Sequence, residues 1–183
     1  MAFSLTARMT AAAALCALLL TGCASSAPTD ELTLAQTKSP VQLLRNEAAS
    51  RMPDEVVAQI LNTQDESTNC RTPETDPEGL LRSWRSIIRF QLVYSDSIDA
   101  AAVVDDLAAS FVDQGWEQGI YGTASIIELT RAGSETNVHI SIKKANEEDQ
   151  VGAEIQLAVA GPCVMTGGKE SGEVRDLGPV DDK

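Results

Sequence analysis

The sequence predicts an α+β domain in which a single antiparallel sheet of four to five strands is covered by helices on one face. Apolar and polar residues alternate from Arg82 to Tyr94, which is the period of a half-buried strand. A helical period follows over residues 99–113, and a period of two returns over residues 116–160. The predicted order of elements is therefore one strand, a helix and four strands. The sheet that they form is expected to have one apolar face and one solvent-exposed polar face.

Two short helices are predicted before the first strand. Ser39-Pro40 is typical of an N-cap followed by a first-turn proline, and it predicts a helix through about Arg51. Pro53 ends this helix, because the residue before a proline is pushed away from helical geometry. Apolar residues at helical spacing predict a second helix from Pro53 to Leu61, and the polar residues 62–79 are expected to form a loop.

The clearest helix covers residues 99–113. Its apolar residues fall on one face and its aspartates on the other, and Gly115 supplies the stop. Asp96 or Ser97 is expected to cap its first turn. The apolar face consists of Ala100, Val103, Val104, Leu107, Ala108 and Phe111.

Four further strands are predicted at residues 116–121, 124–131, 136–144 and 151–160. If the helix returns the chain so that the second strand runs like the first, a meander leaves the fifth strand antiparallel to the first. The predicted sheet order is then 1-5-4-3-2. With only four strands, the last strand would run parallel to the first.

The tetrapeptide Leu20-Thr21-Gly22-Cys23 ends an apolar run that follows the positive charge of Arg8. The run from Met9 to Leu20 is too short for a transmembrane helix, which takes about 20 apolar residues. The tetrapeptide resembles the lipobox of bacterial lipoproteins. An ordinary signal peptide with a chance cysteine is the alternative.

This resemblance implies that residues 1–22 are a signal peptide and that Cys23 carries a diacylglycerol. Residues 23–38 are then the lipidated cysteine and a flexible linker, residues 39–163 the α+β domain with its N-terminal helices, and residues 164–183 a disordered acidic tail. The resemblance also implies an anchor on the extracytoplasmic face of the cell membrane. The stretch from Cys70 to Cys163 also resembles small lipoproteins of high-GC Gram-positive bacteria, through Gly115-Trp116 and Gly161-Pro162-Cys163. This second resemblance implies no activity.

Cys70 and Cys163 remain as an even pair in an oxidising compartment, which predicts a disulfide. Cys70 precedes the first predicted strand and Cys163 follows the last, and the 1-5-4-3-2 order brings these two ends together. A metal site is the rival interpretation. It would need further ligands, and His139 is the only histidine, so no metal and no cofactor are expected.

The charge of the chain disfavours one class of partner. The formal net charge is −13 at pH 7, and binding of nucleic acid needs clustered Lys and Arg that the chain lacks. The same charge is expected to keep the domain off anionic lipid headgroups. The expected partners are the membrane, through the lipid anchor, and an envelope protein or a small ligand.

Three surfaces compete as functional sites. The first, which is the preferred docking surface, is the polar face of the sheet, formed by Arg85, Arg89, His139 and Lys143. The alternative is that these charges are paired with Glu128 and Glu154. The second is a ligand groove between helix and sheet, edged by Trp84, Trp116, Tyr94 and Tyr121. The third is a catalytic site that uses His139 beside Ser141 and Asn137. No hydrolase motif accompanies His139, so no catalytic residue is assigned.

Acidic clusters at Asp105-Asp106, Glu147-Glu148-Asp149 and Asp181-Asp182 are candidates for a divalent cation, but none has a calcium-loop pattern. The function that the sequence favours is a noncatalytic binding or accessory module of the cell envelope. A small envelope enzyme using His139 is the alternative.

Overall fold

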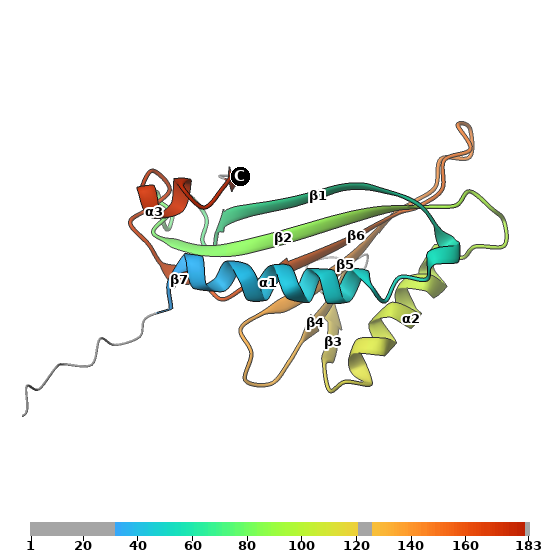
Figure 1. Cartoon of the computed structure of the whole chain (residues 1–183), viewed down its shortest axis with the longest axis horizontal. Helices are drawn as coiled ribbons and strands as arrows, with labels where there is room; N and C mark the ends of the chain where they lie inside the picture. The colour runs from blue at the N-terminus through green and yellow to red at the C-terminus, as the bar shows by residue number, and fades with distance from the viewer. Residues whose placement is uncertain (1–31, 121–125, 182–183) are drawn as a thin grey trace, which may run out of the picture. The chain divides into compact units, whose positions relative to one another are not determined.

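The computed structural model describes residues 32–120 and 126–181 (Figure 1). The α-helices are α1 (Leu34–Ala49), α2 (Ala100–Val112) and α3 (Gly172–Arg175), and a 3₁₀ helix spans Asp54–Val56. The strands are β1 (Val57–Asn69), β2 (Leu81–Leu92), β3 (Glu117–Ile120), β4 (Ile126–Thr130), β5 (Asn137–Lys143), β6 (Glu154–Ala160), β7 (Val164–Met165) and β8 (Val180–Asp181).

The described residues form an α+β fold around one sheet of eight strands. Its order is β3-β4-β5-β6-β2-β1-β8, and β7 pairs with the start of β2. The predicted five strands correspond to β2 to β6, and their order β2-β6-β5-β4-β3 is the predicted 1-5-4-3-2. The predicted strand count was too low. The sheet is also mixed rather than antiparallel, because β8 runs parallel to β1.

The strand β1 is the element that differs most from the prediction, since residues 57–69 were expected to form a helix and a loop. It pairs with β2 over its whole length, from Val57 opposite Leu92 to Asn69 opposite Arg82. Register shifts after Val57 and after Ile60 break its period of two. Ile60 and Leu61 are 58% and 43% exposed, so the helical spacing of these residues did not mark a buried face.

The helix α1 begins six residues earlier than predicted, at Leu34 rather than Pro40, so residues 34–38 belong to the helix and not to the linker. Thr33 is the N-cap: its side chain accepts a hydrogen bond from the N–H of Gln36, whose side chain accepts one from the N–H of Thr33. Pro40 therefore lies inside the helix, where it removes one backbone hydrogen bond. The reciprocal cap stabilises the turn before this defect.

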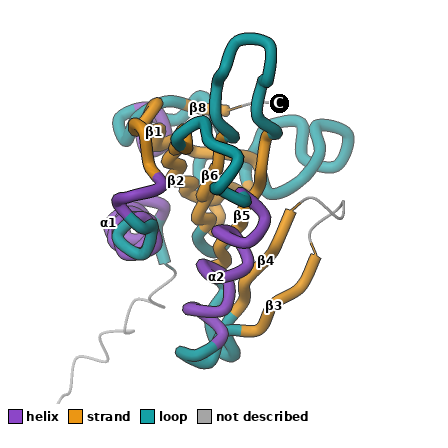
Figure 2. The backbone as a smooth tube through the Cα atoms, turned by 90° about the vertical axis from the view of Figure 1, so that its right-hand side faces the viewer, coloured by secondary structure: helices purple, strands orange, loops and turns teal. Residues whose placement is uncertain are grey.

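Both α1 and α2 pack on the same face of the sheet, as predicted, and share one hydrophobic core with it (Figure 2). Trp84, Phe111 and Leu157 are among its fully buried side chains. Asp99, rather than Asp96 or Ser97, caps α2 by accepting the N–H groups of Ala101 and Ala102. Gly115 follows α2 with a φ of +83°, which agrees with its predicted role as the stop.

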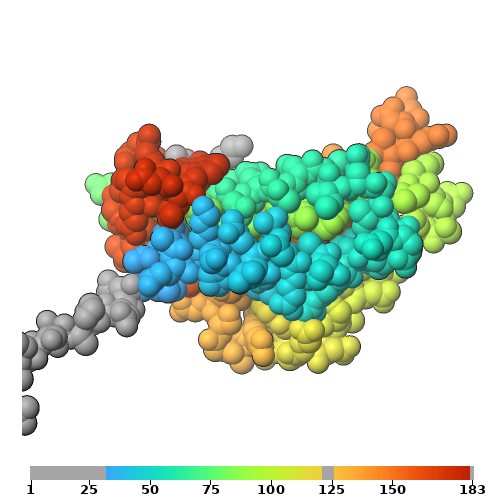
Figure 3. All heavy atoms as spheres, in the orientation of Figure 1, coloured from blue at the N-terminus to red at the C-terminus, as the bar shows by residue number. Residues whose placement is uncertain are grey.

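The C-terminal segment is ordered through Asp181, whereas a disordered tail was expected from residue 164. Val164 and Val174 are buried in the core, and Figure 3 shows this segment against the start of α1. The fully buried Arg82 donates hydrogen bonds to Ser67 Oγ (2.6 Å) and to the carbonyl oxygen of Asp181 (3.2 Å). A few apolar residues and paired backbone groups therefore hold a segment that has no hydrophobic period.

The predicted disulfide between Cys70 and Cys163 is confirmed, with a Cα–Cα distance of 6.1 Å. It joins the chain after β1 to the chain after β6, at the end of the sheet where β2 begins. The proposed lipidation site Cys23 and the signal peptide lie outside the described residues. No helix in the described part of the chain is long and apolar enough to cross a membrane.

Asp76 organises the loop that precedes β2. Its Oδ1 accepts the N–H of Leu80 (2.9 Å) and its Oδ2 accepts the N–H of Leu81 (2.8 Å). The bond from Leu81, followed by that from Leu80, lowers the pKa of Asp76 below its ordinary value. Because the pKa is lower in the folded state, the carboxylate contributes stability that is complete above about pH 5 and is lost as the pH falls through about 4 and below.

We expect Asp76→Asn to lower the melting temperature at pH 7, because an amide offers one carbonyl oxygen where the carboxylate offers two. The variant should also lose less of its melting temperature than the wild type between about pH 5 and pH 2, since the amide does not titrate. Thermal unfolding followed by circular dichroism measures both effects. The exposed neighbour Glu78→Gln is the control, and an equal pH dependence of wild type and Asp76→Asn would contradict the assignment.

Candidate functional site

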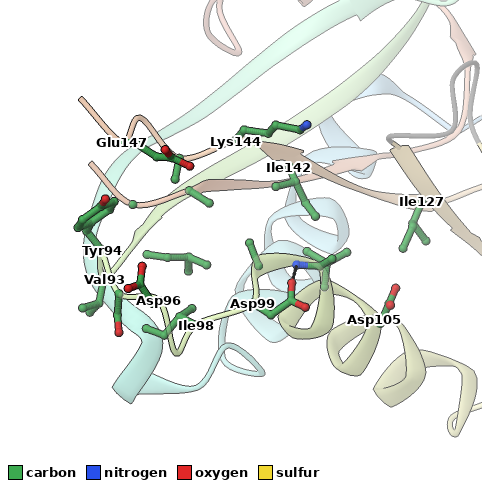
Figure 4. A pocket seen from close by; sticks show the side chains of 18 residues that line it. Val93, Tyr94, Asp96, Ile98, Asp99, Asp105, Ile127, Ile142, Lys144 and Glu147 are labelled. Atoms are coloured by element: carbon green, nitrogen blue, oxygen red, sulfur yellow. Dashed lines mark hydrogen bonds between the residues drawn. The ribbon is translucent and has the colours of Figure 1, made fainter. Parts of the chain in front are cut away.

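A groove of about 730 Å³ lies between the first half of α2 and the end of the sheet opposite the disulfide. Its walls come from the end of β2, the loop before α2, β4, and the hairpin between β5 and β6. Ile127 and Ile142 project from the sheet toward α2, and Ile98 and Val104 line the helical side (Figure 4). The groove is therefore apolar along its length and open at its rim.

Gly152 lets the backbone close the groove at one end. A Cβ atom at this position would lie 2.0 Å from the carbonyl oxygen of Leu92, so only glycine allows the two segments to approach. The N–H of Leu92 donates to the carbonyl oxygen of Ala153 (2.8 Å), which continues the pairing of β2 with the chain before β6. Gly152 is not among the predicted site residues, although a glycine inside a predicted strand is a signal of close backbone approach.

An acidic turn at residues 146–150 places Glu147 at the groove. Asn146 and Val151 exchange backbone hydrogen bonds of 2.9 Å each. The side-chain oxygen of Asn146 accepts the N–H groups of Glu148 and Asp149, which holds the turn in one conformation. The carboxylate of Glu147 is left to line the groove.

Polar side chains stand around the apolar lining. Figure 4 shows Asp96 and Asp105 toward opposite ends of the groove, with Asp99 between them at the start of α2. Tyr94 is 41% exposed and lines the groove beside Asp96. Lys144 is the single basic residue of the lining.

Of the three described aromatic residues that were expected around a groove, only Tyr94 is found there. Trp84 is fully buried and Trp116 is 7% exposed; both belong to the core, where Trp116 packs edge-on against Phe111 at 5.5 Å. Tyr121 lies outside the described residues. Aliphatic residues of α2 and the sheet form the lining instead, because the large aromatics fill the core between the layers.

The four residues of the expected partner surface lie on one face of the sheet, and each is paired with a carboxylate. Arg85 contacts Glu66 and lies 3.0 Å from Asp181 Oδ2. Arg89 and Lys143 form ion pairs with Glu154 at 3.7 Å and 3.8 Å, and His139 Nε2 lies within hydrogen-bond distance of Glu128 Oε1, at 3.2 Å. The carboxylates balance the positive charges, so this face is polar without being basic.

His139 lies on this polar face, on the other side of the sheet from the groove. Its cross-strand neighbours are Glu128 on β4 and Ala158 on β6. Ile140, the next residue along β5, points into the core on the same side as the groove lining. A general base must come within hydrogen-bond reach of bound substrate, and His139 cannot do so for a molecule in the groove.

In the described ranges, no three His, Cys, Asp or Glu side chains are grouped closely enough to hold a metal ion. Asp105 and Glu147, from two of the acidic clusters, line the groove, but on different elements. Comparison of the chain with protein-family models, curated proteins and solved structures found no match. The geometry of the groove is therefore the basis for the proposed function of this protein.

Proposed function

We propose that this protein is a lipoprotein, anchored through Cys23 to the extracytoplasmic face of the cell membrane, that acts as a noncatalytic binding module. Its ligand site is the groove between α2 and the sheet. The groove itself is the observation that carries this proposal. Small-molecule sites are concave, mainly apolar pockets of about 300 to 1,000 Å³ with a few polar groups, and this groove of about 730 Å³ matches that description.

The groove also has the rigidity of a binding site. Ile127 and Ile142 lie on paired strands, and Val104 lies on the buried face of a capped helix that packs into the core. Side chains on such elements keep their positions when a ligand binds, so little ordering entropy is lost. This favours binding in a preformed site.

The helix α1 begins at the end of the domain opposite the groove (Figure 1). The first turns of α1 lie near the C-terminal segment, where Lys38 Nζ donates to the carbonyl oxygen of Leu177 (2.6 Å). The disulfide is at the same end of the sheet, and the groove is at the other end of β2. Anchoring and binding therefore use different ends of the domain.

Obstruction of the groove tests this proposal. We expect the Cys23→Ala form, which carries no lipid of its own, to bind the neutral apolar dye Nile red with a rise in fluorescence. Ala101→Trp should abolish this rise, because Ala101 is exposed on α2 and lines the groove. The next residue, Ala102, is exposed outside the lining, so Ala102→Trp is the matched control and should leave dye binding unchanged.

Two outcomes would contradict the proposal. One is that the wild-type groove binds no dye. The other is that Ala101→Trp and Ala102→Trp bind the dye equally well. His139→Ala is expected to leave dye binding unchanged, since His139 lies on the other face of the sheet.

A further inference from the structure

The groove lining is strongly acidic for a pocket with an apolar interior. Four carboxylates line it, from Asp96, Asp99, Asp105 and Glu147, against the single cation of Lys144. Asp99 already accepts hydrogen bonds from the first turn of α2. Its charge offsets the positive end of the helix dipole, which amounts to about half an elementary charge. The positive end of the helix dipole is therefore already neutralised, and it does not favour the binding of an anionic ligand.

The other three carboxylates contrast with those on the polar face of the sheet. There, Glu66, Glu128 and Glu154 each pair with a basic side chain. The side chains of Asp96, Asp105 and Glu147 form no hydrogen bond or ion pair within the described part of the chain. Three carboxylates without a basic partner among the described residues therefore line the groove.

We infer that the ligand of the groove is a small amphipathic cation, with an apolar body and an ammonium or guanidinium end. This inference rests on the proposed function and assigns its ligand class. The apolar body lies along Ile98, Ile127 and Ile142, and the charged end meets a rim carboxylate. The exposed ring of Tyr94 beside Asp96 adds a face on which a cation is stabilised.

Three eight-carbon probes that differ only in their head group test the inference. Octylammonium, octanol and octyl sulfate are titrated by calorimetry into the Cys23→Ala form, the two ions below their micellar concentrations and octanol below its solubility limit. We expect octylammonium to bind about tenfold more tightly than octanol, and octyl sulfate more weakly than octanol. The preference for octylammonium should shrink as salt is raised from about 0.05 to 0.5 M, because exposed charges are screened.

Neutralising the rim should remove this preference without removing the groove. The triple variant Asp96→Asn, Asp105→Asn, Glu147→Gln is expected to bind octylammonium about as weakly as octanol. The control variant Asp106→Asn, Asp113→Asn, Glu148→Gln removes the same charge at exposed positions outside the lining, and it should keep most of the preference. Lys144→Gln should tighten octylammonium binding by roughly twofold.

The outcomes separate the two proposals. If octanol and Nile red do not bind, the groove is not a ligand site and the proposed function fails. If octanol binds as tightly as octylammonium, or if the two triple variants lose the preference equally, the site stands and the ligand class is wrong. Circular dichroism confirms folding of each variant, and the single variant Asp96→Asn, with a smaller loss of preference, replaces a triple variant that does not fold.

Discussion

Replacing Cys23 by alanine is expected to remove the protein from the membrane fraction completely. In the proposed lipobox the thiol of Cys23 is the acceptor of the lipid, and two acyl chains anchor a protein at about 0.8 kcal/mol for each buried methylene. No helix in residues 32–120 or 126–181 is suited to replace the anchor, and the run from Met9 to Leu20 is too short to span a bilayer. Fractionation after a carbonate wash, with metabolic labelling by a fatty acid, measures the loss.

Cys16→Ala is the matched control for this prediction. Cys16 lies inside the expected signal peptide and should be removed with it, so its replacement should leave labelling and fractionation unchanged. A Cys23→Ala protein that stays in the membrane after the carbonate wash, and still takes up the fatty acid, would contradict the lipoprotein interpretation.

Replacing Cys70 and Cys163 together by serine is expected to lower the free energy of unfolding by about 4 to 5 kcal/mol. The two cysteines are 93 residues apart, and closing so long a loop removes much of the entropy of the unfolded chain. For a domain of this size the loss corresponds to a fall in melting temperature of roughly 10 to 20 °C. Urea unfolding of the double variant measures the first quantity, and calorimetry measures the second.

Reduction of the wild type should reproduce the effect of the double variant, because both remove the same cross-link. Below its melting transition the double variant should still bind Nile red, since the groove lies at the opposite end of β2 from the disulfide. Titration of two free thiols in the native, unreduced protein would contradict the prediction.

The central part of the fold could be predicted because each of its elements carries a local signal. The period of two in β2, β5 and β6 and the capped apolar face of α2 each depend on residues close in sequence. The pairing of Cys70 with Cys163 then selected the sheet order, because it constrained two chain ends that are far apart in sequence. The resulting order β2-β6-β5-β4-β3 agrees with the structure.

The edges of the fold could not be predicted in this way. The strand β1 is irregular in register and exposed on part of its length, so its residues show no clean alternation. The C-terminal segment has few apolar residues, and what orders it is contact with distant partners, such as Arg82 on β2 and Ser67 on β1. Such long-range contacts produce no periodic pattern of apolar residues in either of the two segments that make them.

The sequence by itself therefore determined the α+β class, the five central strands and their order, the disulfide, and the resemblance that proposes a lipid anchor. Only the tertiary structure decided which charged groups are paired and where the chain encloses a groove. The basic residues of the polar face meet carboxylates from neighbouring strands, whereas Asp96, Asp105 and Glu147 do not. The close approach of Gly152 to Leu92, for example, closes one end of the groove. The physical reason is that charge pairing and cavities depend on distances between segments, and a periodic pattern reports only which face of its own segment is buried.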